Sequence, residues 1–415
     1  MKKLLFDVWE KPTPLLWGVL SIQHVFAMFG ATVLVPILTG LPISVALFAS
    51  GLGTLIYIFF TKAKVPVYLG SSFAYIAAVN IAKDAMGGDI SAAQTGLILV
   101  GLVYVVAALA IKVFGKAWIK KLLPPVIIGP MIIIIGLGLA AVAVGSAGFT
   151  TGGDIKVQLA AIATLAVTIF AMVKAKGFFK LIPFMIGIAG GYIAAVALGL
   201  VDFSAIANAP WLALPDFQLP FVHYNFYFGP ETWAIVPIAV VTMSEHIGDH
   251  TVLGKICDKD FLTDPGLDNT LIGDGVATAV SALIGGPANT TYGENTAVVG
   301  MTKVASVWVT GGAAVFAIAI SFVGKLSALI TTIPWAVIGG VSILLYGYIA
   351  ANGLQVLIDQ KVDFAKRRNV IIAAVMLVLG LGGAAFHMIG LATLSGTALA
   401  AIVGVTLNLI LPEAE

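Results

Sequence analysis

The stretch of residues 287–303, "PANTTYGENTAVVGMTK", is polar and carries a carboxylate, Glu294, although the segments on both sides of it are apolar. A carboxylate at membrane depth is energetically costly and usually marks the path of a substrate or an ion. The sequence therefore predicts that Glu294 forms one side of a site for a small molecule. We expect Glu245, in the stretch "SEHIGDH" of residues 244–250, to form the opposite side.

The composition indicates an integral membrane protein. Hydrophobic residues make up 60% of the 415 residues and charged residues only 10%, and the mean hydropathy is +1.06. Soluble domains carry about 25% charged residues, so a soluble chain of this composition could not cover its surface. The single cysteine, Cys257, excludes a disulfide framework and a metal site made of cysteines. Asp7, Glu10 and two prolines interrupt the start of the chain, which favours a short cytoplasmic lead-in over a cleaved signal peptide.

Apolar runs predict the number of membrane segments, because a helix needs about 20 residues to cross the hydrocarbon core. Two of the runs, 66–82 and 290–302, are short and rich in Gly, Ser, Thr and Asn. The predicted fold class is an all-α polytopic membrane protein with fourteen transmembrane segments, in which the broken segments 3 and 10 contain short strands. The fourteen runs are 15–36, 43–61, 66–82, 92–114, 124–146, 157–174, 178–200, 232–254, 268–286, 290–302, 304–324, 327–350, 369–386 and 389–411.

The basic residues support this count. If the N-terminus is cytoplasmic, alternate loops place 19 of the 22 Lys and Arg residues on the cytoplasmic side. Only Lys83, Lys156 and Lys325 fall on the other side. Because an excess of Lys and Arg marks cytoplasmic loops, we expect both termini inside the cell.

The two halves of the chain resemble each other. Each half contains seven segments. Because an odd number of crossings ends on the opposite side of the membrane, the second half must be inverted relative to the first. Inverted repeats are typical of secondary transporters, whose sites lie near the midplane where broken helices meet. Three matching pairs occur in the same order: "QHVFAMFGATVL" from Gln23 with "EHIGDHTVL" from Glu245, "PVYLGSSFA" at 66–74 with "TYGENTA" at 291–297, and "PVIIG" at 125–129 with "PWAVIG" at 334–339.

The stretches "YLGSSFAY" at 68–75 and "TTYGENTA" at 290–297 can each form a short strand followed by a half-helix. Non-helical backbone at membrane depth is tolerated only inside protein or beside a cavity. The N-terminus of a half-helix offers free N–H groups and the positive end of a dipole, which can bind an anion or a carbonyl oxygen. In the alternative interpretation, Gly70, Ser71 and Ser72 only allow helices to pack closely.

The stretch "EHIGDH" carries four titratable side chains. Glu245 and Asp249 share one helical face, and His246 and His250 share the neighbouring face. In one interpretation Glu245 binds substrate while Asp249 or a histidine relays protons. In a second, the histidine pair and a carboxylate bind a metal, although the order differs from HExxH. In a third, Asp249 and His250 are simply hydrated at the cytoplasmic end. His24, which is paired with His246 in the repeat, has either a direct role or a hydrogen bond between helices.

Two carboxylates facing one pocket suit a ligand with N–H donors, because each carboxylate has two acceptor oxygens. A pyrimidine dione offers two N–H groups and two carbonyls, and half-helix N–H groups can bind the carbonyls. Phe73, Tyr292 and Tyr346 are candidate walls for a flat ring, with simple packing as the alternative. Since burial favours the neutral form of a carboxyl, protonation of Glu245 or Glu294 is a plausible step for proton symport.

At these residues the sequence resembles the nucleobase–ascorbate transporter family and, within it, the bacterial uracil permeases. The family signature is an acidic residue or Gln, then Asn, Gly, Thr and a basic residue. It is matched here by Glu294, Asn295, Ala297, Thr302 and Lys303, with Ala297 in place of the usual Gly. The other matching motifs are "SIQHVFAMFGATVLVP", "YLGSSFAYI", "SEHIGDH", "DPGL", "NTTYGENTAVVGMTK" and "GGVSILLYG".

The resemblance implies two inverted seven-segment repeats divided between two domains. The core domain would comprise residues 1–114 and 229–325, and the gate domain residues 115–228 and 326–415. It also implies a homodimer that imports uracil with protons across the inner membrane of a bacterium.

The resemblance implies residue roles as well. Glu245 and Glu294 would bind uracil together with the backbone at Phe73 and Gly293, and Tyr292 and Tyr346 would lie nearby. In the best-known relative we expect a His, linked to proton coupling, at the position of Asp249, so Asp249 or the neighbouring His250 would carry the proton here.

Other functions remain as alternatives. One is transport of another nucleobase such as xanthine, and another is anion exchange on the same architecture, which the two carboxylates disfavour. A metal transporter or membrane enzyme using "EHIGDH" would lack further convergent ligands in the matched repeat. We expect no enzymatic activity, cofactor, metal or nucleic-acid partner; the expected partners are uracil, protons and the lipid bilayer.

Overall fold

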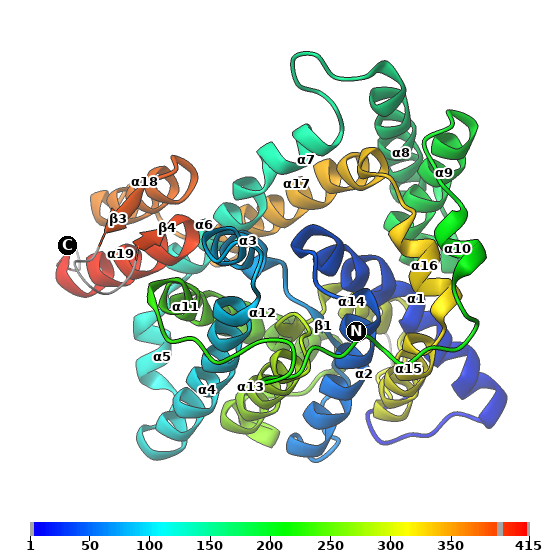
Figure 1. The fold of residues 1–415 in the computed structure, drawn as a ribbon. Helices are drawn as coiled ribbons and strands as arrows, with labels where there is room; N and C mark the ends of the chain where they lie inside the picture. Colours follow the sequence, from blue (N-terminus) through cyan, green and yellow to red (C-terminus); the bar gives the residue numbers. More distant parts are fainter. Residues whose placement is uncertain (1–3, 388–392, 413–415) are drawn as a thin grey trace.

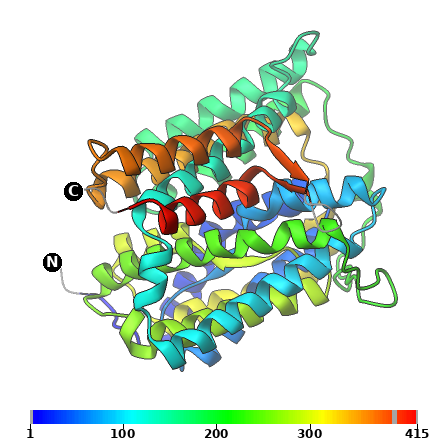
Figure 2. The same ribbon diagram turned by 90° about the vertical axis from the view of Figure 1, so that its left-hand side faces the viewer.

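The computed structural model describes residues 4–387 and 393–412 and is mostly helical within them. Most helices lie side by side along one direction (Figure 2). In the first half of the chain the helices are α1 (Pro14–Thr39), α2 (Ile43–Phe60), α3 (Ile76–Ala85), α4 (Ser91–Phe114), α5 (Ala117–Leu122), α6 (Pro125–Gly138), α7 (Ala140–Ser146), α8 (Ile155–Lys174), α9 (Pro183–Ala197) and α10 (Ser204–Asn208). In the second half they are α11 (Pro230–Ile235), α12 (Ala239–Cys257), α13 (Leu267–Leu283), α14 (Gly293–Thr302), α15 (Val307–Ser321), α16 (Gly324–Thr331), α17 (Trp335–Asp359), α18 (Arg367–Leu381) and α19 (Gly396–Ile410).

Short elements join these helices. They are the strands β1 (Leu69–Ser71), β2 (Asn289–Thr291), β3 (Ala385–His387) and β4 (Thr393–Ser395), the 3₁₀ turns η1 (Phe73–Tyr75), η2 (Gly177–Leu181) and η3 (Val236–Ile238), and the π-helical turn η4 (Leu262–Gly266).

Helix boundaries follow local chemistry. Prolines occupy the first turns of α1, α6 and α9, where the missing N–H has no intrahelical partner. Gly40 ends α1 with a φ of 68°, a left-handed conformation that glycine adopts without penalty. Asp154 caps α8 by accepting a hydrogen bond of 2.8 Å from the backbone N–H of Lys156.

Six of the described helices are long and apolar enough to cross a bilayer, as judged by length and composition. Four of them, α1, α2, α4 and α8, correspond to predicted segments within a few residues. The fifth span joins α6 and α7 into Pro125–Ser146, and the sixth is α17. Shorter apolar helices include α9, α15 and α19.

The helices form two groups (Figure 1). In one group α13 packs against α2 and α4, and α15 packs against α1 and α2. In the other group α17 packs against α6 and α8, and α18 packs against α6 and α19. The first group is drawn together by small residues: a Cβ on Gly101 of α4 or on Gly275 of α13 would collide with the backbone of the other helix.

Strands β1 and β2 cross at the centre of the first group. They pair antiparallel and are fully buried, with Gly70 opposite Thr290. Further backbone hydrogen bonds extend the pairing, from the N–H of Ser72 to the carbonyl of Ala288 (2.9 Å) and from the N–H of Tyr292 to that of Tyr68 (3.0 Å). The strands thus satisfy their backbone groups without water, and each is followed by a short helix, as the sequence predicts for 66–82 and 290–302.

Several predicted boundaries are wrong. The single run 327–350 is two helices, α16 and α17, because Pro334 lacks the N–H needed to continue a helix. The run 232–254 begins as α11 and η3 before α12, with Pro237 at the bend. The strands β3 and β4, which pair between α18 and α19, are not predicted from the sequence at all.

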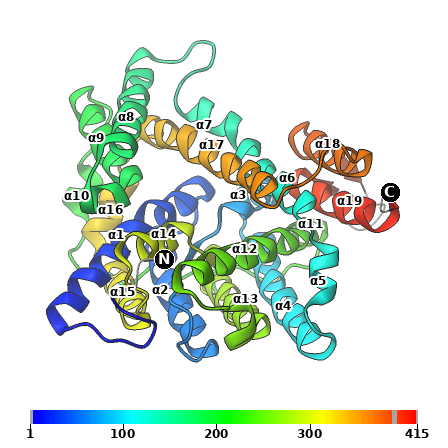
Figure 3. The same ribbon diagram turned by 180° about the vertical axis from the view of Figure 1, so that it is seen from behind.

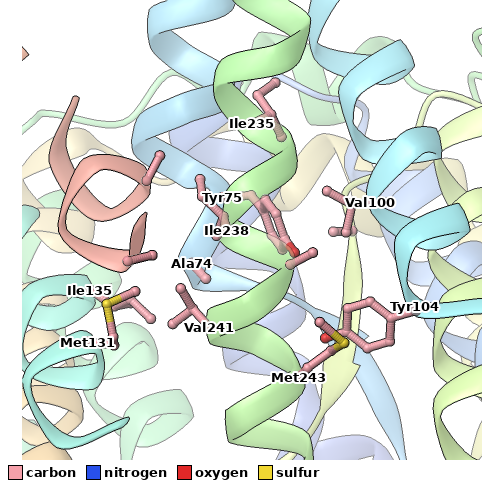
Figure 4. Close-up of a cluster of buried hydrophobic side chains, with 14 of the residues drawn as sticks. Ala74, Tyr75, Val100, Tyr104, Met131, Ile135, Ile235, Ile238, Val241 and Met243 are labelled. Carbon is pink, nitrogen blue, oxygen red and sulfur yellow. The ribbon is translucent and has the colours of Figure 1, made fainter. Parts of the chain in front are cut away.

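A buried apolar cluster joins α12 to its neighbours (Figure 4). Ile238 and Val241 lie beside Tyr75 of η1, Val100 of α4 and Ile135 of α6 in this cluster. The packing fixes one face of α12, so that the face bearing Glu245 and Asp249 is left for other contacts.

Candidate functional site

A cavity of about 490 Å³ lies between the two groups of helices. Its polar end is formed by Glu245 and Asp249 of α12 and by Glu294 in the first turn of α14. The sequence pairs Glu245 with Glu294, and the structure brings both to the same cavity. Other lining residues include Ala31 and Leu34 of α1, Phe73 and Ala74 of η1, Phe184 of α9, and Val341, Leu345, Tyr348 and Asn352 of α17.

The N-terminus of α14 opens onto this cavity. Gly293 is its first residue, and a Cβ there would meet no other atom within 4 Å, so the backbone is accessible from the cavity. The first N–H groups of a helix have no intrahelical partner and lie at the positive end of its dipole. This terminus can therefore bind a carbonyl oxygen beside a carboxylate that accepts an N–H.

Asp249 is held by the second strand. The hydroxyl of Thr291 donates a short hydrogen bond to its carboxylate, and both residues line the cavity. The adjacent Thr290 also lines the cavity, and its hydroxyl has no hydrogen-bond partner among the described residues. Neither threonine is singled out by the sequence, although both stand inside the polar stretch that contains Glu294.

The histidines of α12 face away from the cavity. His246 Nδ1 lies 2.8 Å from the Asp274 carboxylate on α13, and both side chains are fully buried. His250 stacks on His246, hydrogen-bonds through Nδ1 to the His246 carbonyl oxygen (2.6 Å), and contacts the hydroxyl of Tyr57 on α2. His250, expected in the proton path, is therefore separated from the cavity lining. Sequence reasoning missed Tyr57 and Asp274, because only the fold brings α2 and α13 beside α12.

His24 serves as a helix contact. The Asn295 side-chain amide lies 3.0 Å from His24 Nδ1 and donates to the His24 carbonyl oxygen at 3.1 Å. This pair joins α1 to α14 one residue after Glu294. Within the described residues, no three His, Cys, Asp or Glu side chains come together as a metal site requires.

The three aromatic candidates lie near one another. Phe73 and Tyr292 line the cavity, and the Tyr292 hydroxyl donates to the Ser71 carbonyl oxygen at 3.1 Å. Tyr346 is 1% exposed and lies behind Phe73, with ring centroids 6.5 Å apart. It supports the wall that Phe73 forms and is not itself part of the lining.

The lining of the cavity also contains exposed positions outside the group of acids. Lys180 of η2 and Asn352 of α17 are two of these positions.

A cavity that lies between two groups of membrane helices, beside a broken helix and carboxylates, is typical of membrane transporters. The chain belongs to the Permease family, whose model matches residues 16–389. Its relatives are transporters and not enzymes.

Curated relatives cover nearly the whole chain. It is 53% identical to the uracil permease of Bacillus caldolyticus, over 99% of this chain and 96% of that protein. It is 50% identical to the uracil permease of Bacillus subtilis (strain 168), over 100% and 97%. It is 44% identical to the uracil permease of Escherichia coli (strain K12), over 99% and 94%.

Solved structures share the fold at low identity. The transmembrane domain of the cyanobacterial bicarbonate transporter BicA matches with a TM-score of 0.62 and 17% identity, covering 96% of this chain and 98% of that one. SLC26A9 matches with a TM-score of 0.70 and 13% identity, covering 95% and 65%.

Proposed function

We propose that this protein imports uracil into a bacterial cell by symport with protons. The observation that carries the proposal is the meeting of Glu245 and Glu294, from two separate elements, beside the open N-terminus of α14. A ligand with two N–H groups and two carbonyls matches this set of acceptors and donors. The names of the relatives that are 44–53% identical support uracil over other nucleobases.

In the proposed complex the two glutamates accept hydrogen bonds from the uracil N–H groups. The backbone N–H groups at Phe73 and Gly293 donate to its carbonyl oxygens. Phe73 and Tyr292 cover the ring, and Tyr346 supports Phe73 from behind. The lining position of Phe73, Tyr292 and Gly293 supports these roles.

For the protons we propose Glu245, Glu294 and Asp249, which all line the cavity. Burial disfavours a charged carboxylate, so binding of one proton to these acids lowers the free-energy cost of closing the site away from water during transport. His250 and His24 would act indirectly, through Tyr57 and Asn295 respectively.

The transport cycle would use two domains. We propose fourteen segments in two inverted repeats, with a core domain of residues 1–114 and 229–325 and a gate domain of residues 115–228 and 326–415. The antiparallel crossing of β1 and β2 supports inversion, because the helices that follow them leave the crossing in opposite senses. We further propose a homodimer in the inner membrane with both termini cytoplasmic. The two ends of the chain lie at the same end of the molecule (Figure 2), which supports placing both termini on one side of the membrane.

Uptake into proteoliposomes tests this function. Radiolabelled uracil should accumulate along an inward proton gradient and stop when a protonophore collapses that gradient. Unlabelled xanthine and bicarbonate serve as competitors, because another nucleobase and an anion are the alternative substrates. Accumulation that persists without a gradient would exclude symport, and stronger competition by xanthine or bicarbonate than by uracil would exclude uracil as the main substrate.

Thr291→Val is expected to weaken uracil uptake by about tenfold. Valine keeps the shape but removes the hydroxyl that donates to Asp249, and a hydrogen bond to a charged group contributes about 1.5–3 kcal/mol. The measurement is the concentration dependence of uptake, with Thr291→Ser as the control that retains the hydroxyl. Equal uptake by the valine and serine variants would mean that this bond does not serve transport.

A further inference from the structure

The N-terminal segment of residues 4–10, here called the strap, runs across the ends of the two helices that carry the acids. It precedes α1 and lies beside α12 and α14 on the face of the molecule that Figure 3 shows. Nothing in the proposed transport cycle uses the strap, and the motifs of the sequence do not include it.

Backbone hydrogen bonds join the strap to the segment directly after α14. The carbonyl of Lys303 accepts from the N–H of Leu5 (2.7 Å) and of Phe6 (3.3 Å). In return, the N–H of Ala305 donates to the carbonyl of Phe6 (2.9 Å), and that of Val307 to Val8 (3.0 Å). The strap therefore pairs with residues 303–307 in the manner of a short parallel strand.

Side chains reinforce this pairing. The Ser306 hydroxyl donates to the carbonyl of Glu10 at 2.6 Å. Val8 is 1% exposed and belongs to one buried cluster with Leu253 and Cys257 of α12 and Val299 of α14. The Asp7 carboxylate lies 3.2 Å from the ammonium of Lys259, just beyond α12, a half-exposed pair that contributes little on its own.

The position of α14 needs such support. It has ten residues, and a helix this short is marginal without tertiary contacts. It ends at Lys303 in a left-handed conformation with a φ of 61°, which a residue with a Cβ adopts only when its surroundings hold it there. The two N–H groups from the strap bind the carbonyl of that same residue.

We propose that the strap is a positioning element for the substrate site: by binding the far ends of α12 and α14 together, it fixes the separation of Glu245 and Glu294. The inference rests on the proposed function, because it assumes that these two acids hold the substrate. Hydrogen bonds weaken steeply with distance and angle. If the ends of the two helices were less firmly held, Glu245 and Glu294 would bind the ligand more weakly, and affinity would fall more than the turnover rate.

The test replaces residues 4–9 by a Gly-Ser sequence of equal length in the full-length protein. The dissociation constant for uracil should rise by about tenfold, while the maximal uptake rate stays within about threefold. Val8→Thr, a milder change in the buried cluster, should raise the dissociation constant by a smaller factor, and Val8→Ile should leave it unchanged. Amide hydrogen exchange should quicken in α14 and remain unchanged in α4, since exchange reports local opening.

The outcomes separate the two proposals. If the unaltered protein does not bind uracil, the proposed function fails, while the exchange measurement still tests the strap. If the unaltered protein binds uracil and both the Gly-Ser and the Val8→Thr variants bind it equally well, the strap has no positioning role. A Gly-Ser variant that fails to fold leaves the decision to Val8→Thr: an unchanged dissociation constant in it overturns the inference.

Discussion

Uracil uptake is expected to fall by about 100-fold in Glu245→Gln and in Glu294→Gln. Glutamine keeps the shape of glutamate, but it removes the negative charge and replaces one of the two acceptor oxygens by an NH₂ donor. A hydrogen bond to a charged acceptor contributes about 1.5–3 kcal/mol, which corresponds to roughly 10–150-fold in affinity. Each variant also loses one group that could carry a proton, so transport should suffer more than binding.

Initial rates in proteoliposomes and uracil binding in detergent together check this expectation. Asp359→Asn is a matched control, because Asp359 is an exposed acid at the end of α17 whose carboxylate accepts from Gln355 at 2.6 Å, far in sequence from either glutamate. It should retain full uptake. If either glutamine variant kept uptake within threefold of the unaltered protein, the substrate would have to lie elsewhere than between the two carboxylates.

Gly70→Ala is expected to reduce uracil uptake by more than tenfold. A Cβ at this position of β1 would overlap the ring of Tyr292, whose hydroxyl donates to the Ser71 carbonyl oxygen. Because Tyr292 directly precedes Gly293 and Glu294, moving its ring shifts the start of α14. Overpacking of a buried site typically costs about 1–3 kcal/mol of stability. Here the strain would displace the residues that form the substrate site.

The matched control is Gly18→Ala in α1, where an added Cβ meets no atom within 4 Å. It should leave uptake unchanged. Normal uptake in Gly70→Ala would show that the start of α14 tolerates displacement.

The sequence was most informative about features that depend on neighbouring residues, namely the acids in apolar surroundings and the broken helices. Glu245 and Glu294 stand out as acids in apolar surroundings, and the short polar runs around Gly70 and Gly293 predict broken helices; the structure has both strands, each followed by a short helix. The resemblance to a transporter family is confirmed by the match to residues 16–389. Each of these features depends on residues close together in the sequence.

Other features depend on contacts between distant segments and were missed. Helical spacing puts His246 and His250 on one face. That this face meets Tyr57 of α2 and Asp274 of α13 follows only from the positions of those two helices in the fold. Tyr346 is an aromatic residue in a membrane helix, and only its packing shows that it lies behind Phe73. A proline splits the predicted run 327–350, which its hydropathy alone does not reveal.

The crossing of β1 and β2 is held by bonds between main-chain atoms, which every amino acid except proline supplies. Side chains that do not pack closely on the crossing can therefore be exchanged while the strands stay paired, whereas a Cβ on Gly70 would displace Tyr292. Solved structures with this fold are only 13–17% identical to the chain. A paired main-chain frame can thus persist while most of the side chains around it change.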